Sequence, residues 1–165
     1  MGDPELPRPV PAEEPVGPAG QPEPIRVGSN GSRPLAPAED AAATAIVSGA
    51  EGHPPELVAE LRGDPAALLF GMERDGRLAA VFALRREGLT MSLPLLAATT
   101  AWDEWRALKD AVELAGRWPV VVETTEEAAR TYQQAGFRMV SRRKEPDGTY
   151  RYRLGWHVPT RRHPR

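Results

Sequence analysis

The 165-residue sequence predicts one α/β domain, in which a mixed, mostly antiparallel sheet carries helices on both faces and follows a disordered proline-rich tail. Two patterns predict the sheet. Apolar runs on either side of Asp75-Gly76 are typical of a β-hairpin, because this dipeptide favours the tight turn between antiparallel strands. A strand, a helix and another strand follow one another over residues 89–123, which predicts a right-handed parallel crossover.

The two ends of the chain differ in composition from the region between them. Residues 1–24 contain eight of the 18 prolines, five acidic residues, one arginine and no aromatic residue. Such a segment buries too little apolar surface to offset the entropy lost on ordering, so we expect it to be disordered. Residues 158–165 are expected to form a short basic tail, which leaves residues 25–157 as the folded domain.

Charge and residue usage exclude several classes of function. A net charge of −2 shows no sign bias that would suggest nucleic-acid binding. The lack of cysteine excludes disulfides, thiolate metal sites and cysteine nucleophiles, and three scattered histidines predict no zinc site. No apolar run has the length of a membrane span, and the N-terminus lacks the regions of a secretory signal. We therefore expect a soluble cytoplasmic protein that binds no metal.

The N-terminal part of the domain is predicted to contain one strand and two helices. The segment IRV at residues 25–27 predicts a short first strand. A helix is expected to begin at Pro37, whose fixed φ suits a first helical turn, and to end at Gly49. A shorter helix is predicted over residues 55–64, where three apolar residues lie on one side.

A strand over residues 89–97 is predicted from its alternating pattern. Apolar side chains occupy every second position from Leu89 to Leu95, so we expect them on one face. Pro94 interrupts this strand. Because proline has no N–H to donate, it is compatible with a strand only at an edge or a bulge.

The helix predicted over residues 101–115 has a clear apolar periodicity and is followed by Gly116, a helix-ending residue. The side chains expected on its core face are Ala101, Trp105, Leu108, Val112 and Ala115. Trp102 is expected to cover the sheet edge; the alternative is that Trp102 and Trp105 line an apolar ligand pocket.

The last third of the domain is predicted to alternate between strands and a helix. The expected elements are a buried strand at residues 118–124, a helix at 125–136, and two strands at 137–144 and 149–156 joined by the turn EPDG. The helix should bury Ala128, Tyr132 and Ala135 on one side.

Three segments resemble the GNAT superfamily of N-acetyltransferases. Residues 25–47 are similar to its first strand and helix, and residues 70–85 to its second and third strands. The most specific likeness is VVVETTEEAARTYQQAGFRMV, because family members typically show a small residue, then Tyr, then Gly-Phe before a strand. Here these are Ala128, Tyr132 and Gly136-Phe137, and the resemblance spans residues 25–157.

The resemblance implies transfer of an acyl group, usually acetyl from acetyl-CoA, to a small-molecule or protein amine. The backbone of the fourth strand would hold the pantetheine arm where this strand separates from the fifth. That strand contains Leu93, Leu95, Leu96 and Ala97 here, and Pro94 fits the bulge that accompanies the separation. Tyr132 would protonate the departing thiolate. A phenol has an ordinary pKa of about 10, so at neutral pH it still carries the proton that it donates.

The strand–helix junction departs from the resemblance. The superfamily's diphosphate loop reads Arg or Gln, two residues, Gly, any residue, then Gly or Ala, whereas residues 97–105 read AATTAWDEW. Thr99, Thr100 and Ala101 occupy the positions that would bind the cofactor. Thr100 and Asp103 predict a capping-box-like pair that satisfies the helix amides within the protein.

Acidic residues at the same junction are expected to repel a diphosphate. Asp103 and Glu104 stabilise the helix start by about 0.3–1 kcal/mol each, and the same charge opposes an anionic ligand. Two consequences are open. The chain binds acyl-CoA weakly through pantetheine, or it has kept the fold and lost the cofactor.

Glu123, at the end of the predicted fifth strand, is the first choice for the general base that takes the amine proton; the alternative is a solvated strand-end acid. Glu73 and Glu87 are weaker choices because hairpin positions usually carry solvated charge. Thr124 and Glu127 match a capping box, and His53 would face the acceptor side.

These observations lead to two main hypotheses. The first is a GNAT-like N-acyltransferase that uses Tyr132 as its acid. The second is a non-catalytic GNAT-fold binding or regulatory module that has lost CoA binding. An unrelated α/β binding domain is a third, because a fold does not fix a function.

Overall fold

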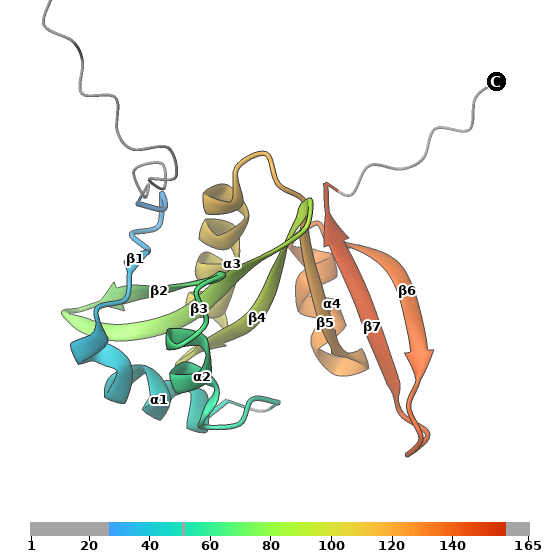
Figure 1. The fold of residues 1–165 in the computed structure, drawn as a ribbon, viewed down its shortest axis with the longest axis horizontal. Coiled ribbons are helices and arrows are strands. Elements are labelled where there is room, and N and C mark those ends of the chain that lie inside the picture. Colours follow the sequence, from blue (N-terminus) through green and yellow to red (C-terminus); the bar gives the residue numbers. More distant parts are fainter. Residues whose placement is uncertain (1–26, 51, 158–165) are drawn as a thin grey trace, which may run out of the picture.

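The computed structural model describes residues 27–50 and 52–157, so the expectations for residues 1–24 and 158–165 lie outside the described residues (Figure 1). The elements in chain order are β1 (Arg33–Pro34), the 3₁₀ turn η1 (Pro37–Glu39), α1 (Asp40–Ser48), α2 (Leu57–Arg62), β2 (Ala67–Arg74), β3 (Arg77–Glu87), β4 (Thr90–Ala98), α3 (Ala101–Ala115), β5 (Val120–Thr125), α4 (Glu126–Gln134), β6 (Arg138–Lys144) and β7 (Tyr150–Trp156).

The strands of the described residues form one sheet in the order β1-β2-β3-β4-β5-β7-β6. Neighbouring strands run antiparallel apart from β4 and β5, which are parallel because α3 connects them. This arrangement confirms the predicted mixed, mostly antiparallel sheet and the crossover over residues 89–123. It places β4 and β5 at the centre of the sheet (Figure 1).

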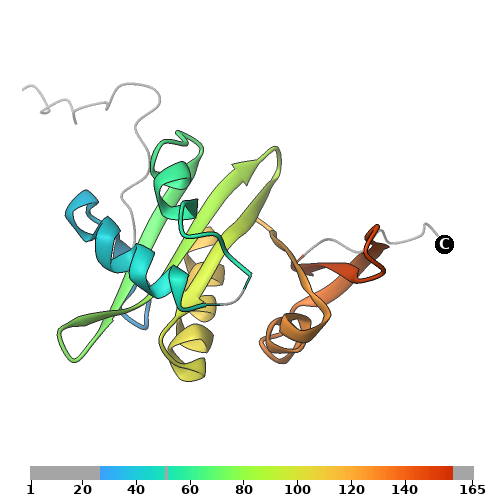
Figure 2. The same cartoon turned by 90° about the horizontal axis from the view of Figure 1, so that it is seen from below.

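Helices cover both faces of the sheet, as predicted, and each face has its own hydrophobic core (Figures 1 and 2). Alternate residues of a strand point to opposite faces. Phe82 therefore packs toward α3 and α4, whereas its neighbours Val81 and Ala83 pack toward α1 and α2.

The hairpin between β2 and β3 confirms the turn that its sequence predicted. Asp75 and Gly76 have φ values of 54° and 73°, both in the left-handed region that a two-residue hairpin turn requires. Asp75 tolerates this conformation better than most side chains do, and Gly76 does so without steric strain.

Of the expected first strand at residues 25–27, only Val27 lies within the described residues. Val27 is exposed and belongs to no strand, residues 25 and 26 lie outside the described range, and the sheet begins at β1. The segment before β1 is held by side chains instead. Asp110 of α3 accepts hydrogen bonds from the amides of Asn30 and Ser32, both at 2.9 Å, so these donors do not enter a strand ladder.

The expected core face of α3 is also partly wrong. Leu108 and Ala115 are buried as predicted, but the other buried positions are Asp103, Ala107, Asp110 and Ala111. Trp105 is only partly buried and stacks on Trp102, which is 62% exposed, with ring centroids 5.2 Å apart. The helix is rotated from the predicted face because its two buried carboxylates find hydrogen-bond donors elsewhere in the fold.

The other helices follow their predicted signals closely. The turn at Pro37–Glu39 leads directly into α1, and Gly49 is its C-cap. Tyr132 of α4 and Ala135 at its C-cap are buried as expected, whereas Ala128 is only partly buried and Ala129 is buried instead. None of the helices in residues 27–50 and 52–157 combines the length and the apolar character that crossing a membrane demands.

Candidate functional site

The centre of the sheet opens where β4 and β5 separate. Within the described residues the two strands pair at Met91 with Val120 and at Ser92 with Val121, and the pairing ends there. Beyond these pairs, β4 continues to Ala98 and β5 to Thr125 without pairing with each other, which leaves a wedge between the two strands (Figure 1). A cleft of about 1660 Å³ lies at this wedge.

A β-bulge in β4 lies at the start of the wedge. Ala83 of β3 pairs with Leu95, whereas Arg85 pairs with Ser92, so Leu93 and Pro94 together face the single residue Leu84. This confirms the bulge predicted at Pro94. It also corrects the predicted alternation, because Leu93 packs toward α3 and α4 while Leu95 packs toward α1 and α2.

Leu89, which was expected on the same face as Leu93 and Leu95, is 79% exposed. It precedes the first residue of β4 and follows Gly88, which has a φ of 61° in the turn between β3 and β4. The strand therefore starts one residue later than the alternating pattern indicated.

Three of the seven predicted cofactor-binding residues line the cleft, and the other four do not. Leu93, Leu96 and Ala97 line the cleft together with Pro94 and Ala98. The side chain of Leu95 is fully buried in the core beneath α1 and α2. The cleft lining does not include Thr99, Thr100 or Ala101, which lie at the turn into α3.

Tyr132 reaches the cleft from α4. Its side chain is 7% exposed and packs edge-on against Phe137, with ring centroids 5.5 Å apart. Burial raises the pKa of Tyr132 well above its ordinary value, and the charge of Glu104 raises it further. The phenol therefore keeps its proton and is available as a donor inside the cleft.

Glu104 of α3 lines the same cleft as Tyr132. It is half-buried, and burial raises its pKa above the ordinary value of a glutamate. The carboxylate is therefore less readily ionised than a surface acid, and its charge adds to the burial that raises the pKa of Tyr132.

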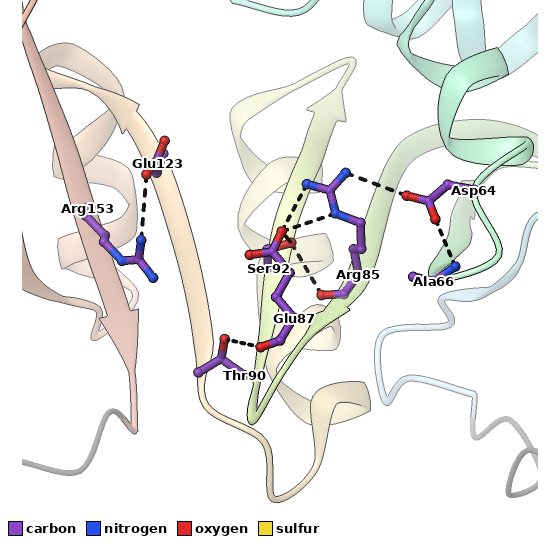
Figure 3. Close-up of polar contacts among 8 residues, drawn as sticks. All are labelled: Asp64, Ala66, Arg85, Glu87, Thr90, Ser92, Glu123 and Arg153. Atoms are coloured by element: carbon purple, nitrogen blue, oxygen red, sulfur yellow. Dashed lines mark hydrogen bonds and ion pairs between the residues drawn. The ribbon is translucent and has the colours of Figure 1, made fainter.

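Glu123 lies on β5 on the opposite side of the sheet from α4, because its neighbour Val122 packs toward α3 and α4. It lines the cleft, is exposed, and lies 3.8 Å from the guanidinium of Arg153 on β7 (Figure 3). Tyr132 and Glu123 thus enter the cleft from opposite faces.

His53, in the loop between α1 and α2, lines the cleft on the side of α1 and is half-buried. Its Nε2 lies 3.2 Å from the carbonyl oxygen of Leu96 in β4. A carbonyl only accepts hydrogen bonds, so Nε2 carries the proton and Nδ1 of the neutral ring keeps its lone pair. Burial lowers the pKa of His53, which favours this neutral form. The sequence carries no local signal for this contact with a strand 43 positions away.

The start of α3 confirms one half of the predicted capping pair. The hydroxyl of Thr100 accepts a hydrogen bond from the amide of Asp103 at 3.1 Å. The carboxylate of Asp103 was expected to reach the amide of Thr100, but it instead accepts from the Thr100 hydroxyl at 2.8 Å and from Nε of Arg74 at 3.0 Å. Asp103 is fully buried, so its charge is compensated inside the fold.

The capping box predicted for α4 is wrong by one residue. Thr125, not Thr124, is the N-cap, and its hydroxyl accepts from the amide of Ala128 at 3.4 Å. Glu127 therefore takes no part in such a box and lies in the cleft lining.

The two weaker acid choices are held by arginines. Glu73 lies 2.6 Å from Arg33. Glu87 contacts Arg85 at 3.0 Å and accepts from the hydroxyl of Ser92 at 3.1 Å, at the closed end of the wedge (Figure 3). Asp64 approaches the same Arg85 to 3.7 Å.

No protein-family model and no curated protein sequence matches the chain. Solved structures do match. An N-acetyltransferase from Staphylococcus aureus Mu50 has a TM-score of 0.61 at 12% identity, covering 76% of this chain and 95% of that one. The chain has the GNAT fold.

Two further GNAT-fold structures extend the likeness. The aminoglycoside 6′-N-acetyltransferase from Enterococcus faecium matches with a TM-score of 0.65 at 12% identity, over 80% of this chain and 99% of that one. A GNAT family acetyltransferase from Elizabethkingia anophelis with acetyl-CoA bound matches with a TM-score of 0.60 at 15% identity, over 77% and 97%. At these identities the likeness concerns the fold.

Proposed function

We propose that this GNAT-fold chain is an N-acyltransferase, which moves an acetyl or other acyl group from a pantetheine thioester such as acyl-CoA to an amine. The observation that carries the proposal is the separation of β4 from β5 after Ser92, with the protonated phenol of Tyr132 at the same opening. A pantetheine arm is extended and carries amide groups, so it suits an unpaired strand edge.

The wedge offers what such an arm requires. Beyond the bulge, the edge of β4 toward β5 has no strand partner in the described residues, so its backbone groups are open to a ligand. Leu93, Leu96 and Ala97 supply apolar walls around that edge. We therefore assign pantetheine binding to this part of β4, with Leu95 acting from the core rather than by contact.

The reaction would replace the carbon–sulfur bond of the thioester by a carbon–nitrogen bond. The acceptor amine supplies the electron pair, a base receives one proton from its nitrogen, and the departing sulfur takes a proton from Tyr132. The raised pKa keeps Tyr132 protonated until that step, and general acid–base assistance of this kind contributes about 10²–10⁴-fold to a rate. We assign the base to Glu123, which lines the same cleft as Tyr132.

The experiment that tests this function is calorimetric titration of the chain with acetyl-CoA, followed by amine acetylation assays with wild-type protein and Tyr132→Phe. Acetyl-CoA at a concentration of 100 times its Kd should raise the free energy of unfolding by about 2.7 kcal/mol. Tyr132→Phe should leave binding unchanged and lower kcat by at least about 10²-fold.

Tyr152→Phe is the matched control, because this tyrosine is equally buried but belongs to β7 and lies outside the cleft lining. Its kcat should equal that of the wild type. Absence of binding at millimolar acetyl-CoA and acetyl-pantetheine would instead indicate a non-catalytic module. Unchanged turnover in Tyr132→Phe would remove this residue from its assigned role.

A further inference from the structure

The turn into α3 differs from the wedge in the state of its polar groups. In a helix N-terminus that binds phosphate, the first amides and nearby cations are free to meet the anion. Here the amide of Asp103, the Thr100 hydroxyl and the Nε of Arg74 are bonded within the protein. Oδ2 of the buried Asp103 accepts from the Thr100 hydroxyl at 2.8 Å, from Arg74 Nε at 3.0 Å and from the Thr99 hydroxyl at 3.5 Å.

Several backbone amides of the same turn also have internal acceptors. The amide of Thr99 donates to the carbonyl of Ala79 at 2.9 Å, whereas the bond from the amide of Glu104 to the carbonyl of Thr100, at 3.0 Å, is the first bond of the helix itself and is present in a bare helix end as well. The amide of Asp103 donates to the Thr100 hydroxyl at 3.1 Å. A diphosphate that approached this turn would find fewer free donors than a bare helix end presents.

The cations beside the turn are engaged as well. Arg106 lies 3.9 Å from Oδ1 of Asp103 and donates to the carbonyl of Asn30 at 3.2 Å. Together with the pairing of Arg74 and Asp103, this reduces the positive charge that the turn presents to an anion. The carboxylate of Asp103 thus already accepts from the hydroxyls of Thr99 and Thr100 and from Arg74, which are donors that a phosphate at this turn would need.

The shape of the turn leads to the same conclusion. Residues 97–105 contain no glycine, so a side chain projects from each position and keeps a ligand away from the backbone. The stacked pair of Trp102 and Trp105 adds bulk at the first turn of α3. The lining of the cleft includes Ala98 and Glu104 but not Thr99, Thr100 or Ala101.

We propose that recognition of the acyl donor ends at the pantetheine arm, so that the diphosphate and nucleoside of CoA add no affinity. The inference rests on the proposed function, since it concerns the donor of the same reaction. It follows from an open wedge for pantetheine beside a helix start where the hydroxyls of Thr99 and Thr100 and the Nε of Arg74 are bonded to Asp103. The same arm occurs in free acyl-CoA and on acyl carrier proteins.

The test compares dissociation constants, measured by calorimetry, and kcat/KM for three donors: acetyl-CoA, S-acetyl-pantetheine and S-acetyl-4′-phosphopantetheine. We expect the three values to agree within about threefold, and the affinity for acetyl-CoA to change little with salt, because few phosphate contacts form. An acetylated acyl carrier protein is the fourth donor. A higher rate with it identifies a protein-borne arm as the source, and an equal rate identifies the free thioester.

An affinity for acetyl-CoA more than about tenfold above that for S-acetyl-pantetheine would overturn the inference and leave the acyltransferase proposal intact. A similar preference for phosphopantetheine over pantetheine would also overturn it. If none of the donors binds, the proposed function fails first and the inference fails with it.

Asp103→Asn tests the cause. Loss of the carboxylate charge frees Arg74 to meet a phosphate, so the preference for acetyl-CoA over S-acetyl-pantetheine should rise at least about tenfold, as expected for a hydrogen bond to a charged group. Glu113→Gln is the matched control, because it removes the same charge from the far end of α3, and its donor preference should stay at the wild-type value. An unchanged preference in folded Asp103→Asn would contradict the role of this carboxylate. If that variant does not fold, the wild-type donor comparison decides.

Discussion

Replacing Asp110 by alanine should destabilise the domain more than almost any other single change on α3. Its carboxylate is fully buried and accepts three hydrogen bonds of 2.9 Å, from the amide and the side-chain amide of Asn30 and from the amide of Ser32. These bonds hold the segment that leads into β1, so their loss would release the first strand of the sheet as well.

The magnitude follows from the burial of each donor. The amide of Ser32 is buried, and leaving it without an acceptor costs about 1–3 kcal/mol. The two donors of Asn30 are only partly buried, so water replaces part of each bond and each loss costs about 0.5–1.5 kcal/mol. The sum is roughly 4 kcal/mol. This is a large part of the free energy of unfolding of a typical domain, which is about 5–15 kcal/mol.

Urea denaturation of the full chain is the assay, followed by circular dichroism. Asp110→Ala should lower the transition midpoint without changing the slope, and should lower Tm by about 10–20 °C. Glu113→Gln is the control on the same helix: its bonds to Ser29 are exposed, so its stability should change by less than about 0.5 kcal/mol. A loss below about 1 kcal/mol in Asp110→Ala would refute the reasoning.

Two further predictions concern the pH dependence of stability. Burial lowers the pKa of His53 below its ordinary 6.5, so below that pH the unfolded chain takes up a proton that the folded chain resists, and stability falls as the pH drops. Urea midpoints at about pH 7.5 and about pH 5.5 should therefore differ less in His53→Gln than in the wild type; equal differences would contradict the assignment. Burial raises the pKa of Glu104 above 4.5, so its stabilising contribution is present below that pH and is lost as the pH rises through the folded-state pKa. Glu104→Gln should thus stabilise the domain relative to the wild type at about pH 7 and have less effect at about pH 4. An equal change in stability at the two pH values would argue against a buried charge.

Features encoded by a few adjacent residues could be predicted from the sequence. The Asp75-Gly76 turn, the helix ends at Pro37 and Gly49, and the bulge at Pro94 depend on local backbone chemistry, and the structure has each of them. The separation of β4 from β5 was expected only through the resemblance to the GNAT superfamily. The register of the two strands confirms it.

Features that depend on distant partners could not be predicted. Helical periodicity treats a charged residue as solvated, yet Asp103 and Asp110 are buried because Arg74, Asn30 and Ser32 supply donors from segments far away in the sequence. For the same reason the sequence did not indicate that Asn30 and Ser32, just before β1, are bonded to α3.

The buried position of Asp103 changes the physical reason for expecting weak diphosphate binding. From the sequence, two carboxylates near a helix end should repel an anion. In the structure, Arg74 offsets the charge of Asp103, and burial makes Glu104 harder to ionise, so long-range repulsion is reduced. What opposes the ligand is competition for the same donors, since a phosphate would have to displace a carboxylate that is already hydrogen-bonded and shielded from water. Competition of this kind is insensitive to ionic strength, whereas repulsion between exposed charges is screened by salt, so the salt dependence of acetyl-CoA binding separates the two causes.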